Sequence, residues 1–181
     1  MMDEFQSQGI WPVEDLEDAQ VREVYSRYGL AMFMAQVLEH GMVNAMIVVQ
    51  LLPARSNFRG HAEWFSAFDK FHDAEFSKTF GNMIRALERI DKFPADFIAR
   101  LQSAKLGRDH LAHRFFRENS EKFFNQAGRL EMIVECEKWI NIFQSADRDL
   151  DAIVGPLRLQ FGISNDLIDQ HVNEIRDKSN S

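Results

Sequence analysis

The spacing of the apolar residues constrains the fold of this sequence more than any other feature. In residues 24–38, 97–106 and 123–143 the apolar positions recur mainly three or four residues apart, the repeat of one helix face. No stretch shows the apolar–polar alternation and the Val, Ile and Thr content of a strand, and the chain has only four prolines and nine glycines. We therefore predict an all-α protein.

Prolines divide this pattern into separate helices. Pro53, the segment 91–94 and the pair Gly155-Pro156 each interrupt it. Proline has this effect because it lacks the amide donor and its ring clashes with the preceding turn. A further turn at Gly162 is expected to precede a short C-terminal helix over residues 165–176.

Two positions are expected to delimit the central helices. Gly107 is predicted to end or bend the helix that precedes it, and Ser120 to cap the next one. The result is a single-domain antiparallel helical bundle of five or six helices. We expect this helical domain at residues 12–176, with an N-terminal tail at 1–11 and a frayed C-terminus at 177–181.

Residues 42–52 are apolar around nearly the whole helix. Such a helix is either buried in its own chain or covered on one side by a partner chain. The longer segment 29–52 could span a membrane, but it contains Glu39, and a charge at that depth costs about 2.5–3.5 kcal/mol on insertion scales. We predict no membrane span.

The net charge and the single cysteine limit the binding partners and the cellular compartment that we expect for this chain. The net charge of −7 excludes a globally basic nucleic-acid-binding surface, so no DNA partner is expected, while a local basic patch can still bind RNA. The single cysteine, Cys136, cannot form an internal disulfide and lies in an apolar helical pattern typical of a buried, inert thiol. The acidic N-terminal residues lack the features of a secretory signal, so we expect a cytoplasmic protein.

Residues 108–116, RDHLAHRFF, bring an arginine, a carboxylate and two histidines into about two helical turns. Leu111 and Phe115 are four residues apart and are expected to face the core. Asp109 and His113 are also four apart, so we expect the carboxylate to hold the imidazole N–H and fix its tautomer.

Arg108 and His113 are five residues apart, which is about 140° around a straight helix. They therefore converge only if Gly107 bends the helix at Arg108, or if a second chain supplies the other half of the site. The alternative is structural: Arg108 pairs with an acid and His113 packs at a helix surface.

An arginine, a polar residue, three further residues, a histidine and an aromatic residue two positions later resemble the signature of HEPN domains. Arg108 matches the arginine, Asp109 the polar residue, His113 the histidine and Phe115 the aromatic position. The resemblance covers about ten residues and a helical setting. It differs at Phe115, because the toxin branch has a tyrosine there that a partner enzyme can modify, and phenylalanine has no hydroxyl.

HEPN domains are all-helical modules, many of them metal-independent endoribonucleases that act as dimers. The resemblance therefore implies a homodimeric ribonuclease of a toxin or phage-defence type, an RNA substrate and a partner or antitoxin protein. RNA cleavage without metal needs groups that take and give protons and a cation that holds the phosphate. Here His113 would move the proton, Arg108 would hold the phosphate and Asp109 would position His113.

Other polar residues are candidates for supporting roles. Glu39 lies in an apolar helix and is expected to pair with a cation or to orient Arg108 or His113 across the bundle. His110 is a second supporting candidate. Exposed arginines are expected to bind RNA around the site or to be solvated only: Arg114, Arg117, Arg55 and Arg59.

Metal and cofactor binding are not expected. His110 and His113 could ligate a metal with a carboxylate such as Glu39, but the Glu-x-x-His repeat of di-iron bundles is missing. The alternative function is a non-enzymatic helical interaction or regulatory module, in which the apolar helix at residues 42–52 binds a partner chain.

Overall fold

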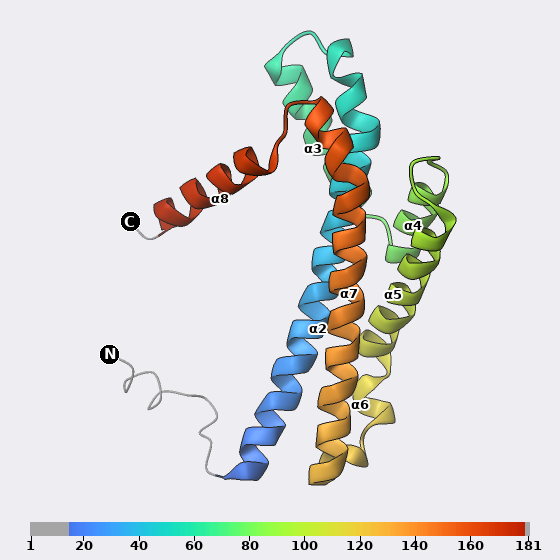
Figure 1. Ribbon diagram of the computed structural model, residues 1–181, viewed down its shortest axis with the longest axis vertical. Helices are drawn as coiled ribbons and strands as arrows, with labels where there is room; N and C mark the ends of the chain where they lie inside the picture. The colour runs from blue at the N-terminus through green and yellow to red at the C-terminus, as the bar shows by residue number, and fades with distance from the viewer. Residues whose placement is uncertain (1–14, 180–181) are drawn as a thin grey trace. The chain divides into compact units, whose positions relative to one another are not determined.

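The computed structural model describes residues 15–179, which form seven α-helices and no β-strand (Figure 1). The all-α prediction is confirmed, with more helices than the five or six expected. The predicted tail at residues 1–11 and the first residues of the expected helical domain lie outside the described residues.

The chain divides into two compact units. The first unit comprises Met1–Leu38 and Gln102–Ser145, and the second comprises Glu39–Leu101 and Ala146–Ser181. The long helices α2 (Leu16–Met46), α5 (Ala95–His113) and α7 (Gln126–Gln160) contribute residues to both units. The expected helical domain at 12–176 stays a prediction.

In the first unit, contacts between side chains give the directions of the three long helices. On α2 and α7, Gln20 contacts Arg129 and Met34 contacts Gln144, so the two helices run parallel. On α5 and α7, His110 lies against Glu135 whereas the earlier Gly107 lies against Trp139, so these helices run antiparallel. The three helices therefore follow an up–down–up order, in which α5 runs antiparallel to both α2 and α7.

The second unit contains the apolar stretch at the end of α2. A π-helical turn, Ile47–Leu51, and a 3-10 helix, Leu52–Asn57, follow α2. The apolar side chains of this stretch are buried, which confirms the first alternative for residues 42–52: Met42, Val43, Ala45, Met46, Ile47, Val48, Leu51 and Leu52. A partner chain is therefore not needed to cover them.

The helical segment Leu16–Asn57 is long and apolar enough to cross a membrane by length and composition. A buried core helix of a soluble protein passes the same test, and 44% of the apolar window is buried. The expectations of no membrane span and of a cytoplasmic location therefore stay predictions.

The remaining helices of the second unit are shorter. Helix α3 spans His61–Phe76 and α4 spans Phe80–Glu88, where the Thr79 side chain accepts a hydrogen bond from the amide of Asn82. After a turn at Gly162 with φ of 77°, helix α8 spans Asn165–Ser179. It continues three residues past the expected end at 176, into the segment predicted to fray.

Two predicted helix boundaries were wrong. Ser120 does not cap the next helix, because α7 begins at Gln126 and the Asn125 side chain accepts a hydrogen bond from the amide of Gly128 at 2.8 Å. The pair Gly155-Pro156 does not end α7, which continues to Gln160.

The predicted helix end at Gly107 was also wrong, whereas the alternative of a bend there stays a prediction. Gly107 lies within α5, and a Cβ atom there would overlap the indole ring of Trp139. The glycine is therefore needed for close helix packing, since any side chain would push α5 away from α7.

Gly107→Ala should lower the free energy of unfolding by about 1–3 kcal/mol, because the new methyl group overpacks the contact with Trp139. Gly29→Ala is the matched control, since Gly29 lies in the middle of α2 and a Cβ atom there would meet nothing within 4 Å. The control should be neutral or stabilising by about 0.5–1 kcal/mol. Equal urea denaturation curves for the two variants would contradict the packing role.

Candidate functional site

The HEPN-like residues lie where α5 ends and the short helix α6 (Phe115–Glu118) begins. The helix is interrupted at Arg114, whose φ of −132° and ψ of −26° depart from helical values. His113 is therefore the last residue of α5. We call residues 108–118 the α5–α6 corner.

Aromatic packing holds the corner in place. Leu111 and Phe115 are buried, as their spacing predicted, and Phe115 is only 1% exposed. Tyr28 of α2 stacks on Phe115 with ring centroids 5.4 Å apart, and its hydroxyl donates to the Leu111 carbonyl oxygen at 3.3 Å. This bond satisfies a carbonyl of the last α5 turn, where helices leave acceptors unpaired.

The Asp109 carboxylate is bound by two cations of its own helix. Lys105 Nζ lies 2.5 Å from Oδ2, and Arg108 Nη1 lies 3.3 Å from Oδ1. The Lys105 hydrogen bond, followed by the Arg108 contact, holds the pKa of Asp109 below its usual range. The expectation that Asp109 holds His113 was wrong, because Lys105 one turn earlier takes the carboxylate.

Arg108 and His113 do not converge within α5. The helix is continuous from Ala95 to His113, so the two residues keep the separation of about 140° that a five-residue step implies. The Arg108 side chain is 32% exposed and His113 is exposed. Both can therefore meet a ligand, but a shared site needs a group from elsewhere.

His110 lies between carboxylates of two other helices. Its Nε2 lies 2.8 Å from Glu135 Oε1 on α7 but makes no hydrogen bond among the described residues, and its Nδ1 lies 3.5 Å from Glu118 Oε2 on α6. The buried Asn119 donates through Nδ2 to the Phe115 carbonyl at 3.0 Å and to Glu135 Oε2 at 3.4 Å. These contacts bring α5, α6 and α7 together at the corner, and the supporting role expected of His110 stays a prediction.

Sequence reasoning missed Glu135 and Asn119. Asn119 is four residues after Phe115, a spacing at which an amide side chain can reach back to the helix carbonyl. Glu135 lies on α7 and His110 on α5, so no local spacing pattern in the sequence indicates that the two side chains are neighbours.

The predicted RNA-binding arginines fall into two sets. Arg114 and Arg117 are exposed in the corner, and Arg117 lies 3.9 Å from Glu118. Arg55 and Arg59 belong to the second unit, where the Arg55 guanidinium lies 4.9 Å from the centre of the Trp64 ring. Arg59 donates its amide to Glu63 Oε2 at 2.7 Å.

Glu39 is half-buried in the second unit, whereas Arg108 and His113 belong to the first. Its expected role in orienting either residue stays a prediction. Glu39 and Arg108 each have an interaction partner.

Thiol chemistry and metal binding are two other candidate chemistries. Cys136 is buried, and burial together with the charges of Glu135 and Glu137 raises its pKa to about 12, so its thiol is a poor nucleophile. Within residues 15–179, no three His, Cys, Asp or Glu side chains form a group that could hold a metal ion.

Comparison with protein-family models, with curated proteins and with solved structures found no match for this chain. The resemblance to HEPN domains therefore stays a prediction that depends on the corner residues themselves.

Asp109→Asn should lower the free energy of unfolding at pH 7 by roughly 0.2–1 kcal/mol, the range for partly exposed ion pairs. Since the pKa of Asp109 is lowered on folding, this difference should persist above about pH 4 and shrink as the pH falls through the folded-state pKa. Urea denaturation at pH 7, 5 and 3 measures it, with the exposed Asp69→Asn as control. A difference that grows in acid would contradict the assigned ion pair.

Proposed function

We propose that this chain is a metal-independent endoribonuclease of a toxin or phage-defence type, which acts as a cytoplasmic homodimer. The observation that supports this most is the placement of Arg108 and His113. Both side chains are accessible to solvent on one rigid helix end, and that end is anchored by buried Leu111 and Phe115.

The proposed RNA cleavage needs proton transfers by His113 and the positive charge of Arg108. His113 of one copy takes the proton of a ribose 2′-hydroxyl, and the 2′-oxygen forms a bond to the adjacent phosphorus. The bond from phosphorus to the 5′-oxygen breaks, and a water molecule gives that oxygen a proton. The protonated His113 then returns its proton to the hydroxide that remains, which restores the water and the neutral imidazole. The products are a 2′,3′-cyclic phosphate and a 5′-hydroxyl.

Arg108 stabilises the negative charge of the phosphate during this cleavage. Its planar guanidinium donates two parallel hydrogen bonds to phosphate oxygens, and it remains charged at any physiological pH. Asp109 contacts Arg108 Nη1 at 3.3 Å and is itself held by Lys105, so the guanidinium is partly pre-positioned. Asp109 thus acts on Arg108 and not on His113.

The second copy follows from the geometry of α5. Because Arg108 and His113 point about 140° apart on a regular helix, one phosphate cannot contact both side chains of the same copy directly. A two-fold axis near the corner would place Arg108 of one copy opposite His113 of the other. Arg114 and Arg117, exposed beside the corner, would then contact the flanking RNA phosphates.

Arg108→Ala and His113→Ala should each reduce cleavage of a labelled single-stranded RNA by at least about 100-fold, the usual loss for a phosphate-binding cation or a general acid–base. His113→Ala should still bind the RNA, since the arginines remain. Expression of the wild-type protein should slow host growth, and either substitution should relieve that effect.

Matched controls use residues of the same types outside the corner. Arg148→Ala and His61→Ala change exposed side chains on α7 and α3 and should leave cleavage unchanged. Circular dichroism and thermal melting of all four variants show whether each is folded. Folded Arg108→Ala and His113→Ala proteins that cleave RNA like the wild type would contradict the proposal.

The second candidate is a non-enzymatic helical interaction or regulatory module. The surface first expected for it, residues 42–52, is buried in the chain. Helix α8 favours an interaction role in its place, because none of its residues is buried. A protein that neither cleaves nor binds RNA, but still binds a protein through α8, would support this candidate over the ribonuclease.

A further inference from the structure

Helix α8 carries an apolar stripe whose C-terminal part is exposed. Ile168, Val172 and Ile175 lie within about 60° of one another around the helix. Val172 is 46% exposed and Ile175 is 56% exposed, while Ile168 is half-buried. Polar residues occupy the other side, so α8 is amphipathic and is typical of a helix that packs against a partner.

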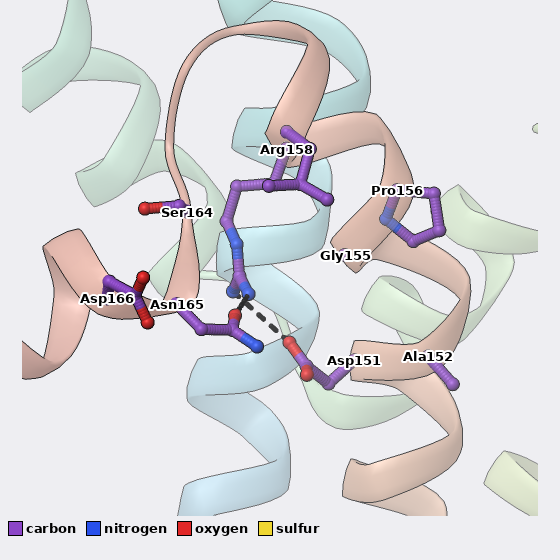
Figure 2. A pocket seen from close by; sticks show the side chains of 9 residues that line it. Asp151, Ala152, Gly155, Pro156, Arg158, Ser164, Asn165 and Asp166 are labelled. Atoms are coloured by element: carbon purple, nitrogen blue, oxygen red, sulfur yellow. Dashed lines mark hydrogen bonds and ion pairs between the residues drawn. The ribbon is translucent and has the colours of Figure 1, made fainter.

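The start of α8 is fixed to the end of α7. Arg158 of α7 donates through Nη1 to Asp151 Oδ1 at 3.2 Å and through Nη2 to Asn165 Oδ1 in the first turn of α8. Figure 2 shows the Arg158 side chain extending between these two residues across the pocket. Gly162, with its positive φ, makes the turn between the two helices.

The stripe repeats every seven residues, because Ile168 and Ile175 are one heptad apart with Val172 between them. In an antiparallel pair of α8 helices related by a two-fold axis near residues 171–172, Ile168 of one copy would lie level with Ile175 of the other. The apolar stripe is therefore complementary to itself in this orientation. In a parallel pair each isoleucine would lie level with its own counterpart.

The charges on one flank of the stripe fit the antiparallel orientation. Asp169 and Arg176 lie on the same flank of the stripe, about 100° and 80° from Ile168. An antiparallel pair places Asp169 of each copy near Arg176 of the other, which gives two attractive contacts. A parallel pair brings opposite flanks of the stripe together instead, so Asp169 and Arg176 would not face each other.

We infer that α8 binds the α8 of a second copy of this chain in an antiparallel pair. Two short repeats bury little apolar surface, so this contact alone gives a weak, reversible dimer. The inference depends on α8 alone and shares with the proposed ribonuclease only the need for a second copy. Its test measures molecular mass and not cleavage, so either idea can fail without the other.

The first test measures the mass of the full chain by light scattering and sedimentation over a broad concentration range. The wild type should pass from monomer to dimer as the concentration rises. Val172→Asp should raise the dimer dissociation constant by about 100-fold or more, because it introduces two charges into the apolar contact. Asn173→Asp, which adds the same charge on the opposite side of α8, should dimerise like the wild type.

The second test exchanges the flanking charges. Asp169→Arg and Arg176→Asp should each weaken the dimer about tenfold, since each turns two attractive contacts into repulsive ones. The double variant Asp169→Arg/Arg176→Asp should regain wild-type dimerisation, and an equimolar mixture of the two single variants should form heterodimers. A wild type that stays monomeric, or charge variants that dimerise like the wild type, would overturn the inference.

Discussion

The close contact between Gly107 and the Trp139 ring is the interaction on which the candidate site depends. It lets α5 pass close to α7 as one continuous helix from Ala95 to His113. A helix that ended at Gly107 could have turned Arg108 toward His113 within one chain. A continuous helix keeps them on different faces, and this makes a second copy a requirement of the ribonuclease proposal.

The end of α5 is fixed by contacts from two other helices. Tyr28 of α2 covers Phe115 and binds the Leu111 carbonyl, while Glu135 of α7 lies against His110. These contacts leave His113 exposed at a defined position, which suits a residue that must meet a substrate. Preorganisation of this kind is how a protein avoids reorganisation during the reaction.

The fold was largely predictable from the sequence, whereas the site was predictable only in part. Helical spacing identified the all-α class and the inward positions of Leu111 and Phe115, because burial of one face follows the helix period. The role of Gly107 could not be predicted, since a glycine that permits close packing has the same local signature as one that ends a helix. The carboxylate partner of Asp109 was misassigned because Lys105 and His113 are both four residues away, and the ion pair with lysine prevails.

The central claim is that Arg108 and His113 cleave RNA only across two copies of the chain. The most direct measurement mixes the two inactive variants, Arg108→Ala and His113→Ala, with RNA in large excess. A mixed dimer keeps one complete site, formed by Arg108 of the His113→Ala copy and His113 of the Arg108→Ala copy. An equimolar mixture should therefore regain about a quarter of the wild-type cleavage rate, as random pairing of two copies implies. A mixture of folded, dimeric variants that stays inactive would contradict the account.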